Sequence, residues 1–195
     1  MASTVAFNNA NTLIRSLQGL VHETSSRFIM DDNYITDNVN FFSKSFLVIT
    51  CAYLEGYIKE VIKIYITHQE ENLKKVNVPQ NLIKWAVQSN KFKVSDENNF
   101  SNFVLSITSK DIDENVSANP YMIKPFFVRL GINLRECNGY DDLAEAVESI
   151  VNLRNSIIHH NDDASSLSLG DVIDKSNTIL RYIEIIDNKV IFSLT

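Results

Sequence analysis

The sequence has little of several features that mark other classes of protein. Its two cysteines, Cys51 and Cys137, lack metal-ligand spacing, so we expect free thiols in a reducing cytosol and no metal site. Glycine-rich phosphate loops and nucleophile elbows are absent, and we expect no bound cofactor. The most apolar segment, residues 46–66, contains four charged residues, which a membrane-spanning helix would rarely tolerate. We therefore expect a protein that does not enter a membrane.

Positive charge is also scarce, because 18 lysines and arginines stand against 24 acidic residues and give a net charge of -6. Non-specific binding to nucleic acid over a broad surface needs many cations that neutralise phosphates. The composition is therefore compatible only with a local cationic site. Lys74, Lys75 and the lysines near Trp85 are a candidate RNA-facing patch, although a solvated face is the commoner explanation for so few charges. The N-terminus lacks a cationic start followed by an apolar stretch, so we expect no secretory signal and a cytoplasmic protein.

Apolar residues recur at three- and four-residue intervals, whereas sustained two-residue alternation is nearly absent. The predicted fold class is therefore all-α, a helical bundle with short additional helices. Neither a repeat nor a long linker divides the 195 residues, so we expect one domain over residues 1–195. Long helices are expected at residues 6–28, 38–68, 143–159 and 168–186, and short ones at 82–87 and 121–130. Residues 188–194 leave open a short terminal strand, and residues 95–99 are expected to form a loop.

The same pattern predicts which side chains are buried and how helices begin. The first helix should bury Leu13, Ile14, Leu17, Leu20 and Val21. Seven aromatic residues are expected in the core or in dimer contacts: Phe41, Phe42, Phe46, Tyr53, Tyr57, Phe126 and Phe127. Ser168 with Asp171 forms an acidic variant of a capping box, and Asp141 and Asp142 are candidate caps of the helix that follows them.

Two charged residues stand where the helical pattern calls for apolar ones. On a helical wheel of residues 142–160, Arg154 falls in the middle of the apolar arc. That arc contains Leu143, Val147, Ile150, Val151, Leu153, Ile157 and Ile158. A guanidinium stays charged at accessible pH, so its burial requires a carboxylate, carbonyl groups or a cleft that admits an anion. Glu55 is the corresponding charged residue within the apolar arc of residues 46–66. Glu55 and Arg154 could form a buried ion pair, which need not be catalytic.

Residues 154–159 read Arg-Asn-Ser-Ile-Ile-His, at the C-terminal end of an amphipathic helix. An arginine, a polar residue, three spacers and a histidine resemble the signature of the HEPN superfamily, whose members are helical bundles that include many RNA-cleaving toxins and defence effectors. With the Glu55-bearing helix before the motif, the closest resemblance is to the RiboL-PSP group. It spans the second helix through His160, which stands where such motifs often continue with glycine.

The resemblance implies a metal-independent endoribonuclease, a toxin or antiviral defence effector, with RNA as its substrate. Arg154 and His159 would be catalytic, and Asn155, Glu55 and His160 would support them. His159 would take a proton from, or give one to, an RNA ribose oxygen, while Arg154 stabilises the phosphorane-like charge. Attack by the 2′-hydroxyl would leave a cyclic phosphate, so DNA should survive.

Side chains five residues apart on a helix diverge by about 140°, so one protomer makes a poor site. A homodimer that packs this helix against its copy could gather both residue types around one cleft, which fits the dimeric sites of the family. Family behaviour also implies an antitoxin or another regulatory protein that restrains the ribonuclease.

Two other interpretations remain open. The chain could be a non-catalytic HEPN-like module that binds RNA, a nucleotide or a protein partner and keeps Arg154 only as a member of an ion pair. It could also be an interaction subunit of a larger defence complex, with an acidic surface that contacts a basic partner. On either interpretation, His159 and His160 are favourable charges against a helix dipole.

Overall fold

The protein is a bundle of helices, seen here in a computed structural model that describes residues 3–88, 102–159 and 166–194. The long helices are α1 (Val5–Ile29), α2 (Asn33–Lys74), α6 (Tyr140–His159) and α7 (Leu169–Leu194). The short ones are α3 (Gln80–Gln88), α4 (Ser109–Asn115), α5 (Pro120–Arg129) and the 3-10 turn η2 (Leu134–Glu136). Within the described residues no sheet forms, and an isolated bridge joins Pro79 to Asn102. The predicted all-α class is confirmed.

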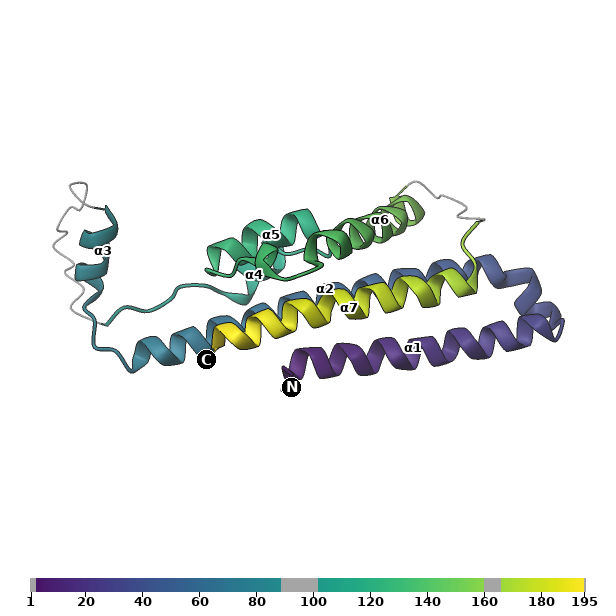
Figure 1. Ribbon diagram of the computed structural model, residues 1–195, viewed down its shortest axis with the longest axis horizontal. Helices are drawn as coiled ribbons and strands as arrows, with labels where there is room; N and C mark the ends of the chain where they lie inside the picture. The colour runs from purple at the N-terminus through teal and green to yellow at the C-terminus, as the bar shows by residue number, and fades with distance from the viewer. Residues whose placement is uncertain (1–2, 89–101, 160–165, 195) are drawn as a thin grey trace.

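Helices α2 and α7 form the middle of the bundle (Figure 1). Helix α1 packs against both from one side, and α6 packs against both from the other. Successive long helices run in opposite directions, so the bundle has up-down-up-down topology. The short helices α4 and α5 lie beside α2 and α6 respectively. Helix α2 thus contacts α1, α7, α6 and α4, and its own sequence must satisfy all of these neighbours.

Local chemistry sets where the helices begin. Asp32 is the N-cap of α2 and accepts hydrogen bonds from the backbone N–H groups of Tyr34 and Ile35. The predicted capping box of α7 is confirmed: the Ser168 backbone donates to Asp171, and the Asp171 backbone donates to Ser168 Oγ at 3.0 Å. Asp141 and Asp142 were expected to cap α6, but both lie inside its first turn, where a carboxylate favours the helix dipole.

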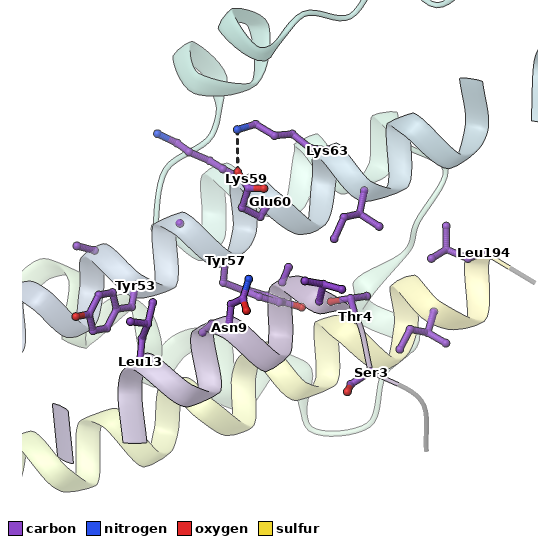
Figure 2. Close-up of a pocket in the computed structure, with 17 residues that line it drawn as sticks. Ser3, Thr4, Asn9, Leu13, Tyr53, Tyr57, Lys59, Glu60, Lys63 and Leu194 are labelled. Atoms are coloured by element: carbon purple, nitrogen blue, oxygen red, sulfur yellow. Dashed lines mark hydrogen bonds and ion pairs between the residues drawn. The ribbon is translucent and has the colours of Figure 1, made fainter. Parts of the chain in front are cut away.

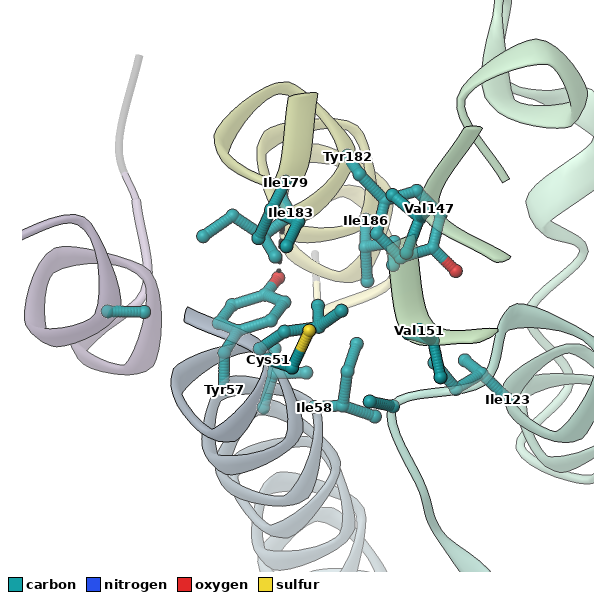
Figure 3. Packing of buried hydrophobic residues seen from close by; sticks show 14 of the residues in the cluster. Cys51, Tyr57, Ile58, Ile123, Val147, Val151, Ile179, Tyr182, Ile183 and Ile186 are labelled. Carbon is teal, nitrogen blue, oxygen red and sulfur yellow. Dashed lines mark hydrogen bonds between the residues drawn. The ribbon is translucent and has the colours of Figure 1, made fainter. Parts of the chain in front are cut away.

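One continuous hydrophobic core joins the long helices (Figure 3). Cys51, Ile58, Ile183 and Ile186 meet where α2 faces α7, and Val147 and Val151 of α6 pack over them. Of the aromatic residues expected inside, Tyr57, Phe126 and Phe127 are buried, whereas Phe41 is exposed. Phe42, Phe46 and Tyr53 are half-buried.

A buried carboxylate ties three helices together at one end of the core. Asp187 of α7 accepts hydrogen bonds from the backbone N–H of Thr4 at 3.0 Å and from its hydroxyl at 2.5 Å. Thr4 is the N-cap of α1, so the carboxylate also lies at the positive end of that helix dipole. Tyr57 of α2 donates to Ile183 O at 3.0 Å and lies 3.3 Å from Asp187. Burial, followed by the nearby Asp187 charge, raises the pKa of Tyr57 well above its ordinary value.

Several sequence predictions need correction. Residues 188–194 are not a strand, because α7 continues to Leu194 and buries Val190 in the core. Helix α2 is longer than expected at both ends, and so is α3. In α1, Ile14, Leu17 and Val21 are buried, but Leu13 and Leu20 are 45% and 56% exposed because they border the packed face rather than lie within it. Ile158 is likewise exposed at the end of α6. The loop expected at residues 95–99 lies outside the described residues.

The Asp187 contacts predict a large effect on stability. Asp187→Ala leaves the backbone N–H and the hydroxyl of Thr4 without their acceptor, whereas Tyr57 keeps Ile183 O, so we expect the free energy of unfolding to fall by about 3 kcal/mol. Asp174→Ala, an exposed position on the same helix, should change it by less than about 0.5 kcal/mol. Urea denaturation followed by circular dichroism measures both. Equal midpoints for the two variants would contradict a stabilising role for the carboxylate.

Candidate functional site

Arg154 lies in the fourth turn of α6, on the side that faces α2. Its side chain is 22% exposed, and its Nη2 atom lies 3.8 Å from Oε2 of Glu55, whose side chain is 30% exposed. The two charges that interrupt the apolar pattern therefore face each other across the α2–α6 packing. The contact is an ion pair, but it is longer than a hydrogen bond.

Glu55 has a closer partner on its own helix. Lys59, one turn further along α2, places its Nζ 2.8 Å from Glu55 Oε1 and 3.7 Å from Asp113 of α4. The hydrogen bond to Glu55 is the main reason why the pKa of Lys59 is raised. Glu55 therefore divides its charge between two cations, and Lys59 holds the shorter contact.

The Arg154 guanidinium is only partly satisfied by its surroundings. Its Nη1 donates to Oδ1 of the adjacent Asn155 at 2.9 Å. Its Nε is buried and has no hydrogen-bond partner, a condition that it shares, in the described part of the chain, with side-chain atoms of Asn40 and Ser43. A buried donor without an acceptor costs free energy, so the fold leaves this part of the guanidinium unsatisfied.

His159 is the last residue of α6 and is exposed, more than one turn beyond Arg154. The structure thus brings Glu55, Arg154 and Asn155 together and leaves His159 at the open end of the helix. Asn155, one turn before His159, is half-buried and is already engaged with Arg154. His160 lies outside the described residues.

Sequence reasoning missed Lys59 and Asp113 as members of this network. Lys59 follows Glu55 by four residues, the spacing of neighbouring side chains on a helix, so a signal for it was present. Asp113 carried no such signal, because its approach depends on how α4 packs against α2. Asp187 was missed too, although it interrupts the apolar stripe of α7 just as Arg154 interrupts that of α6.

A cavity of about 830 Å³ lies between the start of α1, the middle of α2 and the end of α7, and Lys59 is among the residues that line it (Figure 2). Asn9, Leu13 and Tyr53 line it, and the ion pair of Lys63 with Glu60 stands on its α2 side. None of the residues singled out from the sequence as site residues lines this cavity. Its size alone therefore does not make it the site of the chemistry that Arg154 and His159 suggest.

The chain belongs to the RiboL-PSP-HEPN family, whose model matches residues 5–191. The match includes all four long helices and the Arg154–His159 motif. No curated protein and no solved structure matches the chain. The resemblance noted from the motif is thus confirmed at the level of the family, and the family directs attention to a role connected with RNA.

None of the helices in the described ranges has the length and apolar character needed to cross a bilayer. In that same part of the chain, no cluster of three or more histidine, cysteine, aspartate or glutamate residues is placed to hold a metal ion.

The shared Glu55 contact predicts that Arg154 adds little to stability. Arg154→Met restores the apolar arc and leaves Glu55 with Lys59, so we expect the free energy of unfolding to change by less than about 1 kcal/mol. Glu55→Ala should cost more, because it removes the only carboxylate near Arg154 that the described residues provide. Thermal and urea unfolding compare the two variants. A loss of about 3–5 kcal/mol in Arg154→Met would instead mark a structural ion pair.

The reactivity of the Cys51 thiol reports on the packing of α2 against α6, beside Arg154. Burial raises the pKa of Cys51 to about 11, and the Arg154 charge offsets only part of this rise. At pH 8 roughly 0.1% of the Cys51 thiol is therefore ionised, and the residue is also buried. Cys137 is half-exposed, so a reagent in solution reaches it more easily. With iodoacetamide on native protein, we expect mass spectrometry to find label on Cys137 first and on Cys51 only after unfolding. Early labelling of Cys51 would show that the α2–α6 packing opens readily.

Proposed function

We propose that the protein is a metal-independent endoribonuclease that cleaves RNA through attack by a ribose 2′-hydroxyl. Arg154 and His159 are its catalytic residues, and Asn155, Glu55 and His160 support them. The observation that carries the proposal is the Arg154 guanidinium, held in an apolar helix face with a buried Nε that lacks an acceptor. A phosphate oxygen is an acceptor of the right charge for such a group.

The proposed reaction needs no group beyond the side chains and the RNA. The 2′-oxygen loses its proton and bonds to the adjacent phosphorus, and the bond from phosphorus to the 5′-oxygen of the next nucleotide breaks. The products are a 2′,3′-cyclic phosphate and a 5′-hydroxyl. His159 transfers a proton to or from one of these oxygens, and Arg154 stabilises the charge that accumulates on the phosphorane.

A homodimer completes the site in this proposal. His159 lies at the exposed end of α6, whereas Arg154 faces α2, and five residues on a helix turn the two side chains about 140° apart. Two-fold packing of α6 against its copy provides each Arg154 with a histidine from the other protomer.

The biological setting follows from the family rather than from the geometry. We propose a cytoplasmic toxin or antiviral defence effector, restrained by an antitoxin or another regulatory protein. A binding module without catalysis is the second candidate, and the Glu55–Arg154 contact at 3.8 Å favours it, because the same pair can orient α2 on α6 without chemistry.

A cleavage assay on purified protein separates the two candidates. Wild-type protein is incubated with labelled RNA and with DNA of the same sequence in the presence of a chelator. We expect cleavage of RNA alone, a cyclic phosphate product, and a loss of rate of at least a hundredfold in His159→Ala and Arg154→Met. His22→Ala, a change of another exposed histidine, is the matched control and should retain the wild-type rate. Folded wild-type dimer that leaves several RNAs intact would support the binding module.

Mixed dimers test the composite site. Co-expression of Arg154→Met with His159→Ala places one intact arginine and one intact histidine on different chains. A site shared between protomers then recovers part of the activity, whereas a site within one protomer stays inactive. Size-exclusion chromatography with light scattering verifies that the mixed dimers form.

A further inference from the structure

Helix α3 stands away from the body of the bundle, beyond the end of α2 (Figure 1). Its side chains are exposed on nearly every side, with Trp85 61% and Val87 78% exposed and Ile83 alone half-buried among residues 82–87. Trp85 is the only tryptophan of the chain. A large aromatic ring exposed on a projecting helix is free of the core and available for stacking by a ligand.

Charge around α3 has the opposite sign to charge in the rest of the protein. Residues 74–95 contain five lysines and no acidic residue. Because the whole chain has a net charge of -6, removing these five lysines leaves a net charge of -11 on the rest. Lys74 and Lys75 end α2, and Lys84 immediately precedes Trp85. Three of these lysines, Lys74, Lys75 and Lys84, are described and exposed, on the same projecting stretch of chain as Trp85.

We propose that Lys74, Lys75, Lys84 and Trp85 form a docking arm for single-stranded RNA. The lysines neutralise phosphates, and a base stacks on Trp85, which is how proteins hold single strands without reading their sequence. Charge complementarity selects a polyanion, and the flat ring selects one that carries unpaired bases. The inference rests on the proposed function in one respect only, since it takes the docked strand to be the substrate.

The length of α2 sets how much RNA the arm and the Arg154 site can hold together. Lys74 lies 19 residues beyond Glu55 on one uninterrupted helix, which corresponds to about 28 Å at 1.5 Å per residue. At about 3.4 Å per stacked nucleotide, roughly eight nucleotides cover this distance. A single strand of modest length therefore covers the part of α2 between Lys74 and Glu55, the residue that faces Arg154.

Trp85 fluorescence measures the docking directly. Wild-type protein is titrated with a twelve-nucleotide single-stranded RNA whose riboses are all 2′-O-methylated, so that no 2′-hydroxyl is left to attack. We expect saturable quenching, and an affinity whose logarithm falls with the logarithm of salt concentration with a slope of about -2, the value for three phosphate contacts on a single strand. Absence of quenching at low salt would overturn the proposal.

Matched variants assign the binding to the arm, with anisotropy of labelled RNA as the readout. Lys84→Glu should weaken binding about tenfold, and Lys110→Glu, the same charge change at an exposed position on α4, should leave it within about twofold. Trp85→Ala should weaken it about fivefold or more, and Trp85→Phe should recover most of the loss because the ring remains. Equal effects of Lys84→Glu and Lys110→Glu would show that net charge alone matters and would overturn the arm.

Two further outcomes separate this proposal from its rivals. Vesicles of phosphatidylserine and phosphatidylcholine serve as a competing polyanion, and Trp85 fluorescence that responds to them but not to RNA would replace the arm with a membrane contact. If RNA binds through the arm but the wild-type protein cleaves nothing, the docking proposal stands and the ribonuclease proposal fails. If RNA is cleaved while the Lys84 and Trp85 variants bind it normally, the reverse holds.

Discussion

The hydrogen bonds that Asp187 accepts at the start of α1 fix how α1, α2 and α7 meet. A carboxylate buried among apolar side chains is tolerable only when its oxygens are satisfied, and here Thr4 and Tyr57 supply the donors from two other helices. The register of α1 and α2 against α7 follows from that requirement. With those helices fixed, the opposite side of α2 and α7 becomes a defined surface on which α6 packs.

Glu55 and Arg154 lie between α2 and α6, and their charges are less completely paired than that of Asp187. The Asp187 carboxylate has three donors within hydrogen-bond distance, whereas the Arg154 guanidinium has a long contact to a carboxylate that Lys59 holds more closely. Full satisfaction is what a buried structural polar cluster requires. The bundle therefore contains two polar interruptions of similar appearance in sequence: the one at Asp187 is complete within the fold, and the one at Arg154 includes a buried Nε that has no partner among the described residues.

Periodicity alone predicts the all-α class, the four long helices and the opposition of Glu55 and Arg154, because each depends on which side chains share a helix face. It does not predict that α7 continues through residues 188–194. Three charged or polar residues, at positions 187–189, follow the expected end at residue 186 and suggest a break, and only the packing of Val190 against the core shows otherwise. The predicted burial of Leu13 and Leu20 is wrong for a related reason. A helical wheel gives the direction of a side chain but not how far a neighbouring helix extends over it. Asp113 enters the site through the packing of α4 on α2, which no single helix encodes, whereas the spacing of Lys59 from Glu55 is visible within one helix.

The bridge between Pro79 and Asn102, with the hydrogen bond from Phe103 N to Val78 O beside it, brings the two ends of the intervening chain together at the edge of the bundle. These contacts anchor the chain just before α3 to the chain that leads into α4. Helix α3 therefore belongs to an insertion that is fastened to the bundle at two neighbouring points. A segment exchanged between these two anchors would change what projects from the bundle without rebuilding the helix that carries Arg154 and His159.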